Sequence, residues 1–305
     1  MNNQNTYTMV LSHWRDYLAL CKPKIVSLIV FTAVVGMFLA TPGMVPLSVL
    51  IFGTIGIGLA AASAAAINHV VDHKIDSVMA RTMRRPLPKG NVSIQGAILF
   101  AFMLGALAMV ILTYFVNALT AILTAISLIG YGFIYSMYLK RATPQNIVIG
   151  GAAGAAPPVL GWTAVTGTLD PHSLLLFLII FAWTPPHFWA LAIYRCKDYA
   201  SVDIPMLPVT HGVEFTRLHI LLYTIVLTIV SILPFLTYMS GPVYLFGALL
   251  LDAGFLYYAI RMQKDTSDRL AMQTFSYSIV YLMALFAILL IDHYVPHLVQ
   301  LFAAI

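Results

Sequence analysis

The sequence predicts an all-α integral membrane protein with nine transmembrane helices. Of its 305 residues, 61% are hydrophobic and only 9% are charged, and the mean hydropathy is +0.91. The chain therefore has too few polar residues to cover the core of a soluble protein. Apolar runs of about 20 residues, long enough to cross a bilayer core, recur along the chain. The polar–apolar alternation that marks the strands of an outer-membrane barrel is absent from the sequence.

Nine hydrophobic segments are expected to form the spans, and glycine and proline separate several of them. Their approximate ranges are 25–42, 46–67, 95–115, 118–139, 147–167, 172–193, 218–238, 243–261 and 273–292. We expect a single polytopic domain, 1–305, that begins with a polar tail at 1–16. The tail lacks a small-residue cleavage site and is expected to be retained.

The lysines and arginines predict the orientation of the spans. With nine spans, all 16 basic residues fall on one face, before the first span or after even-numbered ones. Basic residues favour the cytoplasmic side. The N-terminus is therefore expected in the cytoplasm and the C-terminus outside, with cytoplasmic loops at about 68–94 and 194–217. Because the net charge of +5 is gathered at the membrane surface, no nucleic-acid partner is predicted.

The first cytoplasmic loop starts with a stripe of oxygen-bearing side chains. Asn68, Asp72 and Asp76 are four residues apart, so on a helix they share one face at the end of the second span. Neighbouring carboxylates repel each other unless a cation lies between them. Mg²⁺ commonly binds through one or two carboxylates plus substrate phosphates. The stripe therefore predicts a Mg²⁺ site.

Basic residues follow this stripe directly. Arginine pairs with phosphate oxygens through two parallel N–H groups, and lysine adds a mobile point charge. An acidic stripe beside a basic segment indicates binding of a metal-bridged diphosphate. The expected diphosphate-binding residues of this loop are Arg81, Arg84, Arg85 and Lys89.

A second acidic segment follows the sixth span. Asp198 and Asp203 are five residues apart, and the basic residues Arg195 and Lys197 lie beside Asp198. Both acidic segments follow an even-numbered span, four spans apart, which suggests two related four-helix halves plus a ninth helix. Charged loops that only orient the spans are the ordinary alternative. That alternative fits the arginines alone but does not account for the acidic spacing.

Four longer blocks support a family resemblance. They are NHVVDHKIDSVMARTMRRPLP (68–88), NIVIGGAAGAAPPVLGWTAVTG (146–167), WTPPHFWALAIYRCKDY (183–199) and DIPMLPVTHG (203–212). The chain resembles the UbiA-type intramembrane prenyltransferases, and within that superfamily the protoheme IX farnesyltransferases, or haem O synthases. The resemblance extends from about Tyr17 onward. It departs from the family pattern in the D-x-x-x-x-D spacing of the second acidic segment, which favours Asp198 over Asp203 as a metal ligand.

The resemblance implies a bacterial inner-membrane enzyme with a UbiA-type helical bundle. Its reaction would transfer the farnesyl group of farnesyl diphosphate to a vinyl group of haem B, giving haem O and diphosphate through a Mg²⁺-assisted allylic cation. The resemblance implies catalytic roles for Asn68, Asp72, Asp76 and Asp198, and Mg²⁺ ligation by these four residues and Asp203. It also places Arg195 and Lys197 among the diphosphate-binding residues. The resemblance also implies further partners: the lipid bilayer, and a downstream haem-modifying enzyme or terminal oxidase assembly.

Two histidines are candidates for haem contact. His187 follows two prolines that are expected to interrupt the sixth span, and a histidine within a span is costly unless it faces a cavity. Haem contact and internal hydrogen bonding are both open for His187, and the resemblance favours haem. His211, near the second acidic segment, is the other candidate. His69 and His73 have the spacing of a metal pair but lack a third ligand.

Other functions stay open at this point. The nearest is the same chemistry on an aromatic quinone precursor, although the blocks at 183–199 and 203–212 favour haem. A secondary transporter also has broken helices and intramembrane acids, but there the acids lie near the bilayer midplane. A haem chaperone would have no use for paired carboxylates. The small residues of 146–167 allow either close helix packing or the approach of a flat ligand.

Overall fold

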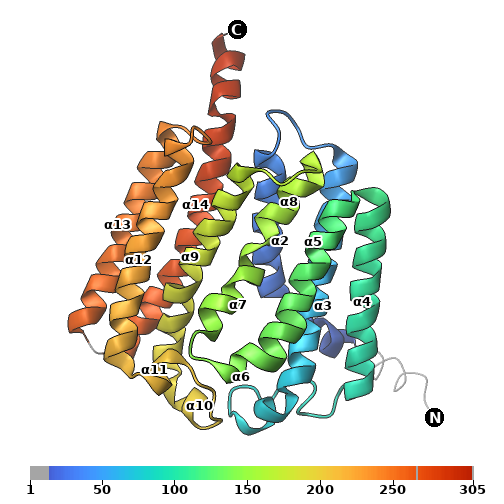
Figure 1. Ribbon diagram of the computed structural model, residues 1–305, viewed down its shortest axis with the longest axis vertical. Coiled ribbons are helices and arrows are strands. Elements are labelled where there is room, and N and C mark those ends of the chain that lie inside the picture. Colours follow the sequence, from blue (N-terminus) through green and yellow to red (C-terminus); the bar gives the residue numbers. More distant parts are fainter. Residues whose placement is uncertain (1–13, 266, 304–305) are drawn as a thin grey trace, which may run out of the picture.

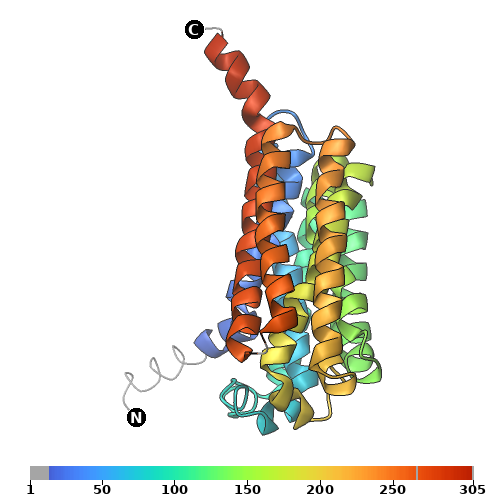
Figure 2. The same cartoon turned by 90° about the vertical axis from the view of Figure 1, so that its left-hand side faces the viewer.

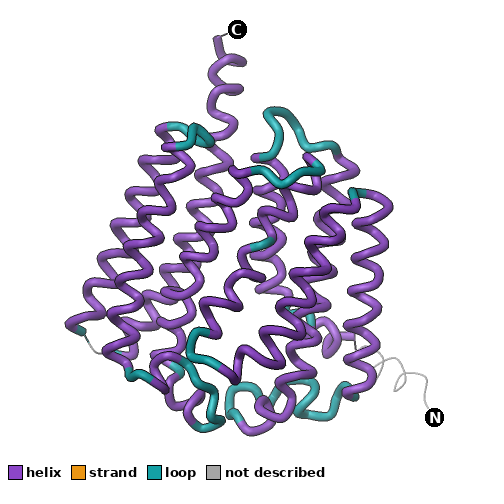
Figure 3. Tube along the Cα trace, in the orientation of Figure 1, coloured by secondary structure: helices purple, strands orange, loops and turns teal. Residues whose placement is uncertain are grey.

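The computed structural model describes residues 14–265 and 267–303, with side chains described up to residue 295. The described chain forms an upright bundle of long helices, and no strand occurs in it (Figures 1 and 3). The helices are α2 (Pro23–Leu39), α3 (Leu47–Val78), α4 (Ile94–Phe115), α5 (Ala118–Ile129), the π-helix η1 (Gly130–Leu139), α6 (Lys140–Ala142), α7 (Asn146–Ala155), α8 (Pro157–Thr166), α9 (Pro171–Tyr194), α10 (Cys196–Ala200), α11 (Leu207–Thr210), α12 (Val213–Leu236), α13 (Pro242–Lys264) and α14 (Asp268–Ala303). Most of the predicted tail, 1–13, lies outside the described residues.

The bundle contains the expected membrane spans. Within the described residues, eight helices are long and apolar enough to cross a membrane, and a ninth span results if the helix Trp14–Leu20 and α2 are counted together. These two helices meet at 53°. At this bend Lys22 has a left-handed φ of 48°, and Pro23 starts α2. The predicted all-α, multi-pass membrane protein is therefore confirmed.

Successive spans run in opposite directions, so their connections alternate between the two ends of the bundle (Figures 1 and 2). One end carries the α3–α4 connection, the short helices α10 and α11, and the α13–α14 connection. We call it the basic end, because all 16 lysines and arginines lie in its connections or in the neighbouring helix turns. The described N-terminal residues lie at this end, and α14 extends beyond the opposite end (Figure 2).

The loops at the basic end are shorter than the sequence suggested. The second span was expected to end at residue 67, but α3 continues to Val78. Polar residues on the inner face of this extension are buried. Contacts inside the protein, and not contacts with lipid, therefore stabilise the extension. The first loop is consequently irregular only from Met79 to Ser93. The second loop occupies 195–212 and contains α10 and α11.

Helix α9 packs against α7, α12 and α14. The expected break at Pro185 and Pro186 is wrong, because α9 is a single helix from Pro171 to Tyr194. Both prolines are buried, and just before them the hydroxyl of Thr184 donates a hydrogen bond to the carbonyl of Ile180 at 2.7 Å. Packing against three neighbouring helices therefore maintains α9 despite the two missing N–H donors.

Two glycines let α2 and α8 touch through their backbones. A methyl group on Gly36 would overlap the carbonyl oxygen of Pro158, and one on Gly161 would overlap the carbonyl oxygen of Ala33. In membranes, small residues at helix crossings allow this close approach. The small residues of 146–167 thus serve helix packing, one of the two roles left open for them.

A buried carboxylate connects three helices in the other half of the bundle. Asp252 of α13 accepts hydrogen bonds from Ser231 of α12 and from Tyr281 of α14, each at 2.7 Å. Hydrogen bonds between helices stabilise membrane bundles modestly. Because both carboxylate oxygens of Asp252 are paired, this group is accounted for by packing.

Helix α14 also provides a cap for α13. The carboxylate of Asp292 accepts hydrogen bonds from the backbone N–H groups of Gly241 and Tyr244, at the start of α13. The first N–H groups of a helix have no partner within the helix, and a negative charge is favoured beside them. Asp292 is buried, so water cannot replace it easily.

We expect Asp292→Ala to lower the free energy of unfolding by about 2 kcal/mol, because it leaves the buried N–H of Tyr244 and the partly buried N–H of Gly241 without an acceptor. Thermal unfolding of the detergent-solubilised protein measures this loss. Asp292→Asn keeps one acceptor oxygen and should lose less stability than Asp292→Ala. Equal melting temperatures for Asp292→Ala and the unaltered chain would contradict the capping role.

Candidate active site

The oxygen-bearing stripe of α3 lies buried at the basic end. Asn68, Asp72 and Asp76 are 6%, 4% and 4% exposed. They occupy successive turns of one continuous helix, as their spacing predicts. Four other segments provide the side chains that contact them: the bend before α2, the π-helix η1, the short helix α6 and the loop after α3.

Asp72 has one paired and one unpaired carboxylate oxygen. Its Oδ2 accepts hydrogen bonds from Lys140 Nζ at 2.6 Å and from Asn68 Nδ2 at 3.0 Å. Its Oδ1 is buried and has no hydrogen-bond partner among the described residues. A buried carboxylate oxygen without a partner is costly. The position therefore suits a cation, and Oδ1 would become a ligand of that cation.

The amide of Asn68 joins three elements. Its Oδ1 accepts a hydrogen bond from Lys22 Nζ at 2.5 Å, and its Nδ2 donates to Ser136 Oγ at 3.3 Å as well as to Asp72. Ser136 belongs to η1, where its hydroxyl donates to the carbonyl of Tyr131, five residues earlier, at 2.9 Å. π-Helical turns are rare and frequently occur at functional sites. Here η1 turns Ser136 toward α3.

Asp76 is paired with the loop that follows its own helix. Arg85 Nη1 lies 2.6 Å from Asp76 Oδ2. In the same loop, the hydroxyl of Thr82 donates to the backbone carbonyl of Asp76 at 3.0 Å. These contacts hold the loop 79–93 against the end of α3, with the Arg85 guanidinium beside the acidic stripe.

Cations outnumber carboxylates around the stripe. Lys22, Lys140 and Arg85 surround Asp72 and Asp76, and Lys22 interacts electrostatically with the other four groups. An excess of positive charge beside two carboxylates suits an anion that carries a metal ion, such as a diphosphate.

Lys22 and Lys140 were predicted only as topological signals, and neither was expected in the site. A signal was available for both. Lys22 directly precedes Pro23 at the entry to the first span, and Lys140 directly follows the fourth apolar run. A lysine at that point can reach the acidic stripe of the neighbouring span.

The other expected basic residues of the first loop lie at its surface. Arg81, Arg84 and Lys89 are exposed. The two loops meet at Tyr199 of α10. Burial raises the pKa of Tyr199, while the charges of Arg81 and Arg195, one from each loop, lower it. Basic residues of both loops therefore act electrostatically on the same side chain.

The second acidic segment is more open than the stripe. Asp198 is half-buried and lies 3.5 Å from Arg195, one turn earlier. Lys197 is exposed, and so is Asp203, whose φ of 52° is unusual for a residue other than glycine. Within residues 14–265 and 267–303, no three His, Cys, Asp or Glu side chains are grouped so that they could hold a metal ion. The structure does not gather Asp198 and Asp203 with the stripe.

The candidate haem contacts differ in position. His187 is buried, with Nδ1 2.6 Å from Ser278 Oγ and its ring stacked on Trp183 and Phe275 at centroid distances of 4.1 and 4.6 Å. Internal hydrogen bonding, one of its two open roles, is thus present. His211 is exposed at the end of α11.

His69 and His73, one turn apart on α3, have different surroundings. The ring of His69 is 3% exposed, and both of its nitrogens lack a hydrogen-bond partner among the described residues. Nδ1 of His73 lies 2.9 Å from the carbonyl of Val70. His73 is therefore used within its own helix.

Comparison with known proteins gives the family of the chain. Residues 29–291 match the UbiA prenyltransferase family. The chain belongs to this family. It is 62% identical to a protoheme IX farnesyltransferase of Methylococcus capsulatus, a match that covers 92% of this chain and 95% of the relative. The predicted resemblance and the predicted enzyme class, a prenyltransferase, are confirmed.

Solved structures of the UbiA type have the same fold at low sequence identity. Digeranylgeranylglyceryl phosphate synthase superimposes with a TM-score of 0.78 at 18% identity, over 92% of this chain and 99% of that one. A UbiA homologue from Archaeoglobus fulgidus, bound to GPP and Mg²⁺, gives a TM-score of 0.59 at 16% identity, over 90% and 99% of the two chains. The predicted UbiA-type helical bundle is confirmed.

Proposed function

We propose that this prenyltransferase transfers the farnesyl group of farnesyl diphosphate to a vinyl group of haem B, giving haem O and diphosphate. The observation that carries the proposal is the 62% identity, over nearly the whole of both chains, to a protoheme IX farnesyltransferase. The excess of cationic side chains around a buried acidic stripe supports the diphosphate half of the reaction.

The cations of the site are the proposed diphosphate ligands. Arg85 and Lys140 are held by Asp76 and Asp72, and Lys22 by Asn68, so each is already directed to the stripe. A diphosphate would compete with these protein oxygens for the N–H groups of the three cations, because the oxygens of the diphosphate have a higher charge density. The other basic residues of the two loops would add to this attraction; these are the exposed Arg81, Arg84, Lys89 and Lys197 and the half-buried Arg195.

The donor set of α3 fits Mg²⁺. Its groups are carboxylate and amide oxygens, which Mg²⁺ prefers, and Oδ1 of Asp72 is buried without a partner. Asp72, Asp76 and Asn68 would hold the ion, with Asp198 and Asp203 as the proposed ligands from the second loop. Lys22 would have to release Asn68 Oδ1 first. Bound Mg²⁺ supplies positive charge that stabilises the diphosphate as a leaving group. The Mg²⁺ in the Archaeoglobus fulgidus homologue supports this assignment.

The chain's own residues assist the departure of diphosphate. The bond between the farnesyl C1 and the diphosphate oxygen breaks, and the electron pair leaves with the diphosphate. Arg85, Lys140 and Lys22 stabilise the charge that develops there. The resulting allylic cation needs surroundings with little water, which the buried position of the stripe favours.

The remaining steps occur on the two substrates. A haem vinyl carbon attacks farnesyl C1 and forms the new C–C bond, which leaves a cation beside the porphyrin. Water adds to that cation and loses a proton, giving the hydroxyethylfarnesyl group. Of the two haem-contact candidates, His211 is exposed and His187 is buried. Nδ1 of each already has a hydroxyl partner, Thr210 at 2.8 Å for His211 and Ser278 at 2.6 Å for His187.

An apolar cavity lies at the start of η1. It has a volume of about 380 Å³ and is lined by residues of α5, η1, α7, α8 and α9, among them Ile126, Gly130 and Leu160. Gly130 is the first residue of η1, and Lys140 follows the last one. An elongated farnesyl chain with its diphosphate at Lys140 would extend along η1 toward this cavity.

We also propose the placement of the enzyme in the bacterial inner membrane. The basic end faces the cytoplasm under the positive-inside rule, so that the N-terminus is inside and the C-terminus outside. The bilayer is then the source of both apolar substrates. A downstream haem-modifying enzyme or terminal oxidase assembly would take up the product.

The direct test uses the purified chain in lipid nanodiscs with haem B, farnesyl diphosphate and Mg²⁺. Pigments are extracted and weighed by mass spectrometry. We expect a product heavier than haem B by one farnesyl group plus one hydroxyl group. EDTA should reduce it to background, and added Mg²⁺ should restore it.

The control reaction is the Methylococcus capsulatus relative in the same nanodiscs. If the relative forms the product and this chain does not, the proposal is wrong. An aromatic quinone precursor replaces haem B in a parallel reaction. Prenylation of that acceptor instead of haem would establish the rival function.

A further inference from the structure

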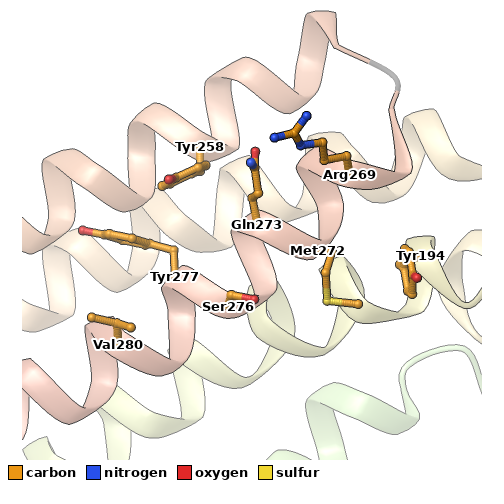
Figure 4. A pocket seen from close by; sticks show the side chains of 8 residues that line it. All are labelled: Tyr194, Tyr258, Arg269, Met272, Gln273, Ser276, Tyr277 and Val280. Atoms are coloured by element: carbon orange, nitrogen blue, oxygen red, sulfur yellow. The ribbon is translucent and has the colours of Figure 1, made fainter.

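A separate cavity opens on the outside of the bundle, at the basic end. It has a volume of about 620 Å³ and lies where α13 and α14 run side by side, next to the last residue of α9 (Figure 4). None of its lining residues belongs to the site described above. Its size is within the range of sites for small ligands.

One part of the wall consists of hydrogen-bond donors. Arg269, Gln273 and Ser276 follow one another along one face of α14, and Tyr258 of α13 lies across from them (Figure 4). The lining contains one full positive charge and no carboxylate. Its chemistry therefore suits an anion with several acceptor oxygens, such as a phosphate.

These donors are free to bind a ligand. Within the described residues, neither Arg269 nor Gln273 has a hydrogen bond or an ion pair, and both are exposed. Arg261, also at this end, differs: its guanidinium lies 3.8 Å from the carboxylate of Asp265 and donates to the Tyr257 hydroxyl at 3.2 Å. Polar groups on the outer face of a membrane span are costly unless they reach water or a polar partner.

The cavity changes from polar to apolar along α14. Arg269 is in the first turn of the helix, and Val280 lines the other end of the cavity, roughly 16 Å farther along the helix axis. Met272 and the ring of Tyr277 lie between them (Figure 4). A polar end at the membrane surface followed by an apolar wall is the order in which a phospholipid presents its head group and acyl chain.

We propose that this cavity binds an anionic phospholipid, with its phosphate at Arg269 and Gln273 and an acyl chain along Tyr277 and Val280. Lipids with negative head groups are attracted to basic residues at the cytoplasmic surface. Haem is an alternative ligand, because its carboxylates would also accept hydrogen bonds from Arg269 and Gln273. A rigid porphyrin, however, does not require an apolar wall that continues along the helix. The assignment holds whichever acceptor the enzyme uses.

The test is native mass spectrometry of the purified full chain, titrated with phosphatidylglycerol and, separately, with phosphatidylcholine. We expect the unaltered chain to retain phosphatidylglycerol preferentially. Arg269→Gln should weaken that binding roughly tenfold, because it removes a charged hydrogen-bond donor. Arg261→Gln makes the same charge change at the same end of the bundle, at an arginine that is already paired, and should bind as the unaltered chain does.

Two further measurements keep the outcome decisive. Arg269→Lys retains the charge and should recover most of the binding, which separates loss of the ligand from loss of the fold. The proposal is overturned if Arg269→Gln and Arg261→Gln bind phosphatidylglycerol equally. Haem binding is measured by absorbance. The proposal is also overturned if Arg269→Gln weakens haem binding and leaves phosphatidylglycerol binding unchanged.

Discussion

Asp72→Asn is expected to reduce farnesyl transfer on the order of a thousandfold, the loss typical when a group that stabilises charge in the transition state is removed. The amide keeps the shape of the side chain and one oxygen for Lys140, which now donates to Asp72 at 2.6 Å. It does not keep the negative charge or the second carboxylate oxygen, which is buried and unpaired. The bundle should therefore stay folded while the proposed metal ligand is lost.

The measurement is the initial rate of haem O formation, together with the thermal melting of each variant. Asp268→Asn removes an exposed carboxylate at the basic end and serves as the matched control, with an unchanged rate. Asp72→Ala should be as inactive as Asp72→Asn but less stable, because it leaves Lys140 without its carboxylate. A rate for Asp72→Asn within tenfold of the unaltered chain would refute the role of Asp72.

Gly161→Ala is expected to destabilise the whole bundle by about 3 kcal/mol or more, at the upper end of the usual cost of overpacking. The added methyl group would overlap the backbone carbonyl of Ala33, which cannot rotate away as a side chain can. Relief requires α2 and α8 to separate. Since α2 begins beside Lys22, their separation would also disturb the proposed active site.

Gly154→Ala is the control for this prediction. It lies in the same glycine-rich segment, and a methyl group built there meets no atom within 4 Å. Alanine is also the better helix former, so Gly154→Ala should be neutral or slightly stabilising. Melting temperatures and the monodisperse fraction in size-exclusion chromatography compare the two variants. Similar values for both would show that the α2–α8 contact is not close.

The order of the spans could be predicted from the sequence because apolar length and basic charge are local properties. The end of α3 could not. Residues 68–78 are too polar to count as a span, and they remain helical because their polar inner face is buried in the protein. The same reason explains α9. Pro185 and Pro186 are strong local signals for a break, and three packed neighbours override them.

The candidate site shows the same limit. The four-residue spacing placed Asn68, Asp72 and Asp76 on one face, because that relation lies within a single helix. The lysines that contact them, Lys22 and Lys140, are 46 and 68 residues away from Asn68 and Asp72 in the chain. Such contacts depend on how α2 and η1 pack against α3, which spacing along one segment does not determine.

The π-helical winding of η1 has a consequence for how this protein can change through insertions and deletions. Each residue of a helix turns the chain by roughly a quarter of a circle, so removing one residue between Ser136 and Lys140 would rotate the lysine away from Asp72. The segment 130–139 should therefore tolerate exchange of its lipid-facing side chains while its length stays constant. The ten-residue helix η1 thus acts as a fixed-length spacer, because its register with α3 keeps Lys140 beside Asp72.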